Sequence, residues 1–190
     1  MQMKETFAIV AAIMAVIGNL PYLLDVFRKK IRPHPYTWLV WSIVSGVTFF
    51  GQLAKGAGVG VIPTAAAEIF TIIIFFFSLR YGFRDIQKKD TLFLIIALLG
   101  LVPWALTKDP TISVIIVVSI DFVAFIPTIR KTYLKPKSEN AILYSMNVTR
   151  HTLTLFSLEA YNIVTTLHSI VMIILNTIMS YIILRNKKRS

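Results

Sequence analysis

Five polar side chains stand inside long apolar stretches of the chain, at similar distances from a run of basic residues. They are Asn19, Glu68, Asp121, Arg150 and Asn176. On a helix that rises about 1.5 Å per residue, Glu68 lies roughly 18 Å from its basic run and the other four roughly 13–15 Å. Charged and amide groups are costly in apolar surroundings and usually have a partner or a function there. The spacing therefore predicts one shared polar cavity that binds a small polar solute.

Asp121 and Arg150 are expected to meet, because they share a depth and stand in neighbouring stretches. Two interpretations are open: a static ion pair that neutralises both groups, or a pair that breaks when an anionic solute takes Arg150 or a proton takes Asp121. Glu68 has no cation in its own part of the chain. Since apolar surroundings favour the neutral form of a carboxyl group, Glu68 is either a neutral hydrogen-bonding group or a proton carrier. Alternatively, Arg150 serves both carboxyl groups.

The remaining residues give no sign of catalysis or of a cofactor. The chain has no cysteine, which excludes disulfides, zinc–thiolate sites and iron–sulfur clusters. His151 and His168 are interpreted as packing groups rather than metal ligands, and no nucleophile–base pair or Gly-rich phosphate loop occurs. Asn19 and Asn176 either bind a hydroxylated ligand or join neighbouring helices. The sequence predicts a protein that is not an enzyme and holds neither metal nor cofactor.

Composition indicates the elements that position these groups. Of the 190 residues, 56% are hydrophobic and 15% are charged, whereas soluble domains are about 45–50% apolar and about 25% charged. A bilayer-spanning helix needs roughly 20 mostly apolar residues, and seven stretches qualify: 5–27, 36–54, 60–80, 90–107, 111–130, 140–158 and 162–184. We expect an all-α, polytopic protein with a single membrane domain over 1–190. Trp38 and Trp41 are expected to anchor the second stretch at the membrane surface, unless Trp41 turns inward.

Basic residues predict the orientation of the seven stretches. Only Lys4, Lys55 and Lys108 fall on one side of the predicted membrane, and Arg150 lies within a stretch. The other side holds sixteen: Arg28, Lys29, Lys30, Arg32, Arg80, Arg84, Lys88, Lys89, Arg130, Lys131, Lys135, Lys137, Arg185, Lys187, Lys188 and Arg189. Short loops with this excess lie in the cytoplasm, so the N-terminus is predicted outside and the C-terminus inside. The same clusters favour contact with membrane lipids and not with nucleic acid.

The two halves of the chain share an order of features. Pro21 and Pro127 are 106 residues apart, as are Trp38 and Tyr144. This spacing predicts a first three-helix repeat over 1–85, a linker helix over 86–108 and a second three-helix repeat over 109–190. Because the linker crosses the membrane once, the repeats are parallel. Pro21 and Pro127 are either simple kinks or, since they occupy equivalent places, hinges for a gate.

These features resemble those of the SWEET and PQ-loop superfamily, seven-helix membrane proteins built as three plus one plus three. The segment 126–133 (IPTIRKTY), followed by Lys137 and Ser138, is similar to a PQ-loop repeat. The glutamine of the PQ pair is replaced by Tyr22 in the first repeat and by Thr128 in the second. The second and sixth stretches also lack the prolines of the sugar transporters. The resemblance therefore implies solute transport, with sugar as one option.

Four further segments resemble those of a group of uncharacterised bacterial membrane proteins, to which no substrate is assigned. They are 33–41 (PHPYTWLVW), 79–82 (LRYG), 107–110 (TKDP) and 121–128 (DFVAFIPT). The resemblance covers nearly the whole chain. This resemblance implies a location in the bacterial cytoplasmic membrane.

The expected function is a transporter or facilitator of a small polar solute that works by alternating access, either coupled to protons or passive. The alternative is a receptor-type protein on the same scaffold, as a resemblance to KDEL receptors allows, which binds a ligand without moving it. Expected partners are membrane lipids, the solute and, if transport is coupled, protons. A homo-oligomer is an open option.

Overall fold

Seven α-helices and two short 3₁₀ turns form the part of the chain that the structure describes, and this part contains no strand. The computed structural model describes residues 2–107 and 109–187, without the side chains of residues 2, 100, 101, 103, 104, 110, 186 and 187. The elements are α1 (Gln2–Phe27), α2 (Pro35–Ala54), η1 (Gly58–Val61), α3 (Ile62–Tyr81), α4 (Lys88–Leu106), α5 (Pro110–Leu134), η2 (Pro136–Ser138), α6 (Ala141–Ser157) and α7 (Ile163–Lys187). The predicted all-α class is confirmed.

Local sequence signals explain where the helices begin. Proline occupies the first turn of α2, α3 and α5, where its missing N–H would have no partner in any case. The Asp109 carboxylate caps α5 by accepting the amides of Thr111 at 2.7 Å and Ile112 at 3.0 Å. These two hydrogen bonds hold the pKa of Asp109 below its usual value. The Asn140 side chain caps α6 in the same way, from the amide of Ile142.

Five of the helices are long and apolar enough to cross a membrane. The crossing segments are Met3–Phe27, Pro35–Ala54, Gly58–Tyr81, Thr111–Leu134 and Ile163–Arg185. Large apolar side chains on them face outward, among them Ile13, Phe76 and Ile174, as expected when the surrounding solvent is a bilayer. The chain therefore has the character of a membrane protein.

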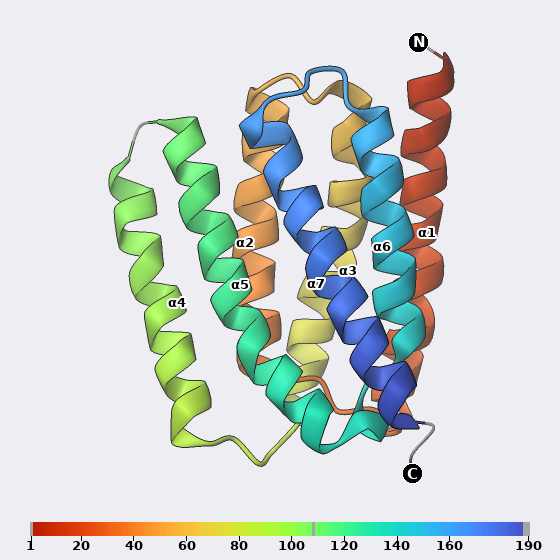
Figure 1. Ribbon diagram of the computed structural model, residues 1–190, viewed down its shortest axis with the longest axis vertical. Helices are drawn as coiled ribbons and strands as arrows, with labels where there is room; N and C mark the ends of the chain where they lie inside the picture. Colours follow the sequence, from red (N-terminus) through yellow and green to blue (C-terminus); the bar gives the residue numbers. More distant parts are fainter. Residues whose placement is uncertain (1, 108, 188–190) are drawn as a thin grey trace.

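The expectation of seven crossing helices is met for five of them. Helix α6 has 17 residues, which span about 26 Å against a bilayer core of about 30 Å, and it carries Arg150 and His151. The first turn of helix α4 consists of the charged residues Lys88, Lys89 and Asp90, which shortens its apolar part. Both nevertheless run alongside the other helices (Figure 1).

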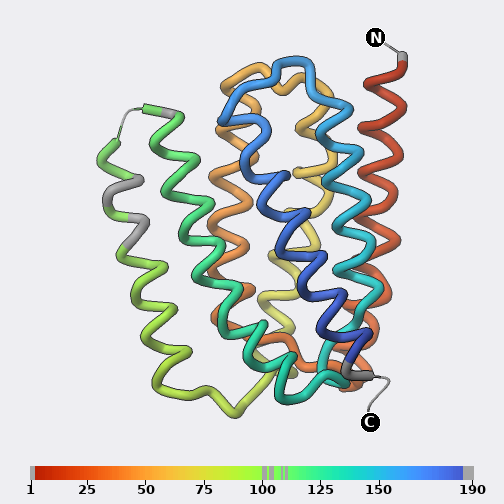
Figure 2. The backbone as a smooth tube through the Cα atoms, viewed as in Figure 1, coloured from red at the N-terminus to blue at the C-terminus, as the bar shows by residue number. Residues whose placement is uncertain are grey.

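The helices alternate in direction and pack in a regular order (Figures 1 and 2). Helix α3 contacts both α1 and α2, and α7 contacts both α5 and α6. The two groups meet along α1 with α6 and along α2 with α5. Helix α4 lies at one edge, against α5 and α2. Gly18 permits the close approach of α1 to α6, because a Cβ there would lie 2.9 Å from the Cβ of Met146.

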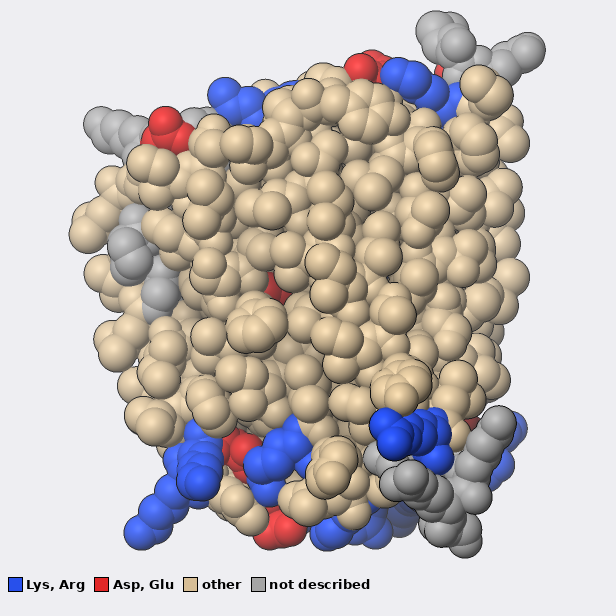
Figure 3. All heavy atoms as spheres, in the orientation of Figure 1, with Lys and Arg blue, Asp and Glu red and all other residues tan. Residues whose placement is uncertain are grey.

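Charged side chains gather at the two ends of the bundle, and the belt between them is almost entirely uncharged, with acidic atoms visible in a hollow near its middle (Figure 3). Most Lys and Arg residues lie at the lower end of Figure 3. We call this the basic end; it carries the α1–α2, α3–α4 and α5–α6 connections. Lys108, Lys188 and Arg189, which count toward the predicted charge bias, lie outside the described residues. Pro21 and Pro127 lie within continuous helices, α1 and α5.

Candidate functional site

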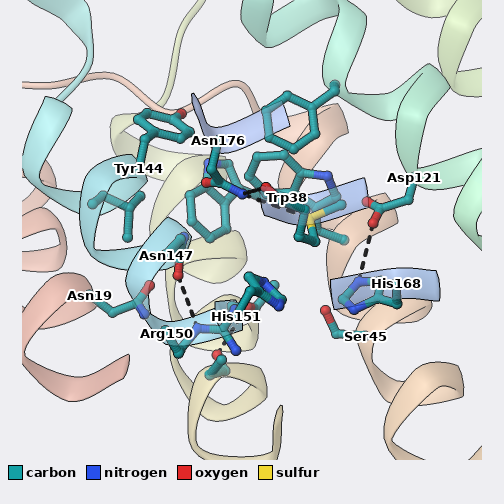
Figure 4. Close-up of a pocket in the computed structure, with 16 residues that line it drawn as sticks. Asn19, Trp38, Ser45, Asp121, Tyr144, Asn147, Arg150, His151, His168 and Asn176 are labelled. Carbon is teal, nitrogen blue, oxygen red and sulfur yellow. Dashed lines mark hydrogen bonds and ion pairs between the residues drawn. The ribbon is translucent and has the colours of Figure 1, made fainter. Parts of the chain in front are cut away.

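A polar cavity of about 60 Å³ lies in the interior of the bundle (Figure 4). It has room for several water molecules, at roughly 10–15 Å³ for each. Six helices contribute to its wall, and the polar residues that line it are Asn19, Ser45, Thr71, Asp121, Asn147, Arg150, His151, His168 and Asn176. The structure thus brings together four of the five residues singled out from their spacing: Asn19, Asp121, Arg150 and Asn176.

Glu68, the fifth of these residues, lies just outside the cavity. Its half-buried carboxylate accepts a hydrogen bond from Ser45, and Ser45 lines the cavity. The second oxygen, Oε2, is buried and has no hydrogen-bond partner among the described residues. Glu68 was expected to line the cavity itself. It is instead linked to the cavity through its interaction with Ser45.

The expected pair of Asp121 and Arg150 is not formed. Asp121 is 2% exposed, and its Oδ2 lies 3.3 Å from Nε2 of His168, an ion pair when the imidazole is protonated. The two residues are joined by a dashed line in Figure 4, with Arg150 across the cavity from them. The Asp121 side chain points toward α7, whereas the Arg150 side chain contacts residues of its own helix, α6. The two residues share a depth but do not contact each other.

Arg150 is 6% exposed and is held by its own helix. Its Nε donates to Oδ1 of Asn147 at 3.1 Å, and its Nη2 lies 2.6 Å from Nε2 of His151. Because a guanidinium group can only donate, His151 Nε2 must accept, and the His151 proton sits on Nδ1, which faces Ser169 Oγ at 3.3 Å. In this arrangement His151 is neutral. Within the described part of the chain, nothing accepts a hydrogen bond from Nη1 and no carboxylate pairs with Arg150.

The two histidines connect the halves of the cavity. Their rings pack edge to face with centroids 5.5 Å apart, so the polar groups run from Arg150 through His151 and His168 to Asp121. His168 was expected to be a packing residue. Its sequence does carry a signal that could have found it, because His168, Met172 and Asn176 recur every four residues and so share one face of a helix.

Asn19 and Asn176 present their carbonyl oxygens to the cavity. Each side-chain amide nitrogen donates to a carbonyl one turn earlier in its own helix, Asn19 to Ala15 at 2.8 Å and Asn176 to Met172 at 2.7 Å. No donor in the described residues reaches either Oδ1. The cavity therefore offers two acceptors in addition to the donors of Arg150.

An aromatic layer closes the cavity toward the basic end. Neighbouring ring centroids are 5.4 Å apart for Tyr22 and Trp38, 5.1 Å for Trp38 and Trp41, and 4.6 Å for Trp41 and Phe125. Trp38 is 3% exposed, so its expected role as an anchor at the membrane surface is wrong. Trp41 turns inward, the alternative considered for it, and both tryptophans line the cavity.

A buried ionic layer lies beyond the aromatic layer. Lys131 is ion-paired with Glu139 and donates to the Arg32 carbonyl at 2.7 Å. Asn140 donates to Asp25 at 3.0 Å, which ties the α5–α6 connection to α1. Together these contacts join α5 and the α5–α6 connection to α1 and the α1–α2 connection at the basic end.

The α3–α4 connection is part of the same layer. Asp90 accepts from Nε of Arg130 at 3.1 Å and from Nη2 at 2.5 Å. His34 lies 3.6 Å from Asp90. Burial lowers the pKa of His34 from 6.5 to about 4, although Asp90 acts in the opposite direction. Burial raises the pKa of Asp90, but the hydrogen bonds from Arg130 and from the Gln87 amide outweigh it and hold that pKa below its ordinary value.

No group of three or more possible metal ligands occurs in the described residues. Comparison of the chain with protein-family models, with curated proteins and with solved structures gave no match. The assignment of function therefore depends on the fold and on the cavity.

Proposed function

We propose that the chain crosses the membrane seven times as two parallel three-helix repeats joined by α4, with its N-terminus outside and its C-terminus in the cytoplasm. The packing supports this: α3 and α7 hold equivalent places in their groups, and the α1–α6 contact is matched by the α2–α5 contact. The basic end would then be the cytoplasmic end. The proposal includes a likeness to the SWEET and PQ-loop superfamily and a location in a bacterial cytoplasmic membrane.

Cysteine labelling tests the orientation, and the chain offers a clean background because it has no native cysteine. We expect Lys55→Cys and Glu159→Cys, both exposed and away from the basic end, to react in intact cells with an impermeant thiol reagent. Lys30→Cys, Lys89→Cys and Lys137→Cys should react only after the cells are broken. Labelling of Lys89→Cys in intact cells would contradict the seven-span arrangement.

We propose that the protein moves a small polar solute across the membrane by alternating access between the two repeats. The single observation that carries this proposal is the polar cavity, which lies in the interior of the apolar bundle and is lined by residues of both groups of helices. In the orientation proposed above, the aromatic and ionic layers separate it from the cytoplasm. Moving a solute through would require these layers to part, and Pro21 and Pro127 are the proposed hinges. Asp121 with His168, and Glu68, are the proposed proton carriers if transport is coupled.

Solute flux into liposomes tests this proposal. Ser45→Phe should reduce uptake by about tenfold or more, because the ring would occupy most of a cavity that holds only several water molecules. Ser119→Phe is the matched control, since Ser119 is exposed on α5. Radiolabelled glycerol and glycolamide test the transport of neutral solutes, and radiolabelled glycolate tests the transport of an anion. Each solute is offered with and without an imposed proton gradient, which tests coupling to protons. If Ser45→Phe and Ser119→Phe took up every solute equally well, the proposal would be contradicted. Binding without flux would instead favour a receptor.

A further inference from the structure

An unpaired cation faces the cavity. Ionised groups in a protein interior are almost always paired, because removal of a charge from water is costly. Arg150 is 6% exposed and sits in the wall of the cavity, yet among the described side chains it is hydrogen-bonded only to Asn147 and His151, neither of which carries a negative charge. Its Nη1 has no acceptor among the described residues. The missing component is an anion.

The charges around the cavity indicate which anion fits. Asp121 on α5 lies 3.3 Å from His168 on α7, whose charge offsets that of Asp121 when the imidazole is protonated. His151 on α6 accepts from Arg150, and the side chain of Glu68 on α3 interacts with Ser45. With His168 protonated, the positive charge of Arg150 is the one left without a counter-charge among the described residues that line the cavity. A single negative charge would balance it, whereas a dianion would bring an excess into apolar surroundings. A carboxylate matches the guanidinium geometrically, because its two oxygens can accept two parallel N–H bonds.

The other polar groups of the wall include both acceptors and donors. Oδ1 of Asn19 and Oδ1 of Asn176 have no donor in the described residues, so they suit a ligand hydroxyl group. Trp38 and Trp41 also line the cavity, and their buried indole N–H groups have no acceptor in the described residues. The volume of about 60 Å³ limits the ligand to a few heavy atoms. We infer that the solute of the proposed transporter is a small hydroxycarboxylate monoanion, with its carboxylate on Arg150 and its hydroxyl toward the asparagines. This inference rests on the proposed function and names its substrate class.

Binding can be measured through two tryptophans, because Trp38 and Trp41 line the cavity and are two of the three in the chain. The probes are glycolate, its neutral isostere glycolamide, and chloride. We expect glycolate to change the fluorescence of the purified protein in detergent, and glycolamide and chloride to bind at least about 100-fold more weakly. Equal binding of glycolate and glycolamide would overturn the inference, as would displacement of glycolate by an equal concentration of chloride.

Two substitutions assign the effect to Arg150. Arg150→Gln should weaken glycolate binding by about 100-fold, and Arg150→Lys, which keeps the charge without the two-pronged geometry, by about tenfold. Arg185→Gln is the matched control, since Arg185 is exposed on α7 and hydrogen-bonds to Tyr181 on the same helix. Thermal melting verifies folding, and Arg150→Lys keeps the test decisive if Arg150→Gln does not fold. Unchanged glycolate binding by either folded variant would overturn the inference.

The liposome measurement separates this inference from the proposed function. Ser45-dependent flux of glycerol or glycolamide without flux or binding of glycolate would overturn the substrate class and leave transport standing. Arg150-dependent binding of glycolate without any flux would leave the anion site standing and contradict transport. Glycolate flux that is lost in both Ser45→Phe and Arg150→Gln would support both.

Discussion

Glu139→Gln is expected to lower the free energy of unfolding by about 3–5 kcal/mol, because it would leave Lys131 buried without a counter-charge. Lys131 is 0% exposed and Glu139 is 5% exposed, and in the part of the chain that the structure describes the one other acceptor on the Lys131 ammonium is the Arg32 carbonyl. The hydroxyl groups of Tyr22 and Tyr144 also lie near the Glu139 carboxylate. The loss would therefore open the ionic layer at the basic end. Reversible unfolding in micelles, followed by circular dichroism, measures the free energy.

Two companion variants give this prediction its control. Glu159→Gln makes the same change on an exposed carboxylate and should alter the unfolding free energy by less than about 0.5 kcal/mol. The double variant Lys131→Met/Glu139→Gln should recover more than half of the loss, since it removes the stranded charge as well. A double variant no more stable than Glu139→Gln alone would mean that the two residues do not act as a pair.

The parent protein should lose about 3 kcal/mol of stability through His34 alone as the pH falls from about 6.5 to about 4. In this window the unfolded chain protonates His34, whose unperturbed pKa is about 6.5, whereas burial keeps the folded pKa near 4. The unfolded state then binds more protons, so the unfolding free energy falls with falling pH. Above pH 6.5 both states are neutral at His34 and this contribution is fully present. Lys131 and Arg130 reinforce the shift, and Asp90 opposes it.

His34→Asn isolates this contribution, because asparagine does not titrate. Asparagine is also the residue found 106 positions later, at Asn140, in the equivalent place of the second half. His34 is the residue before α2, as Asn140 is before α6. Asparagine should also cap α2 and add about 1 kcal/mol at every pH. The measurement is the unfolding free energy of parent and variant at several pH values between 4 and 7.5. Parallel curves for the two proteins would show that His34 does not titrate in this way.

Much of the candidate site could be predicted from residue spacing alone. A helix has a fixed rise, so the distance of Asn19, Asp121, Arg150 and Asn176 from their basic runs places them at one level, and all four line the cavity. The all-α class followed from apolar runs long enough to cross a bilayer, and five helices have that character. Both inferences depend on length along the chain, which the sequence contains directly.

Direction around a helix could not be predicted in the same way. Asp121 and Arg150 share a level, but the partner of Asp121 is His168, on a helix that the chain reaches 42 residues later. Trp38 resembled a membrane-surface anchor, and only packing against Tyr22 and Trp41 turned it inward. Glu68 lies at nearly the right level, but Ser45, with which it interacts, lines the cavity and Glu68 does not.

The sequence by itself therefore determined the helical class, the level of the polar groups and the uneven distribution of basic residues. Each of these follows from local composition and from the constant rise of a helix. Only the tertiary structure decided which polar groups meet, because a side chain's partner depends on how six helices are rotated and packed against one another. That packing placed Asp121 beside His168 and left Arg150 without a contacting carboxylate among the described residues, and the proposed anion site rests on this result.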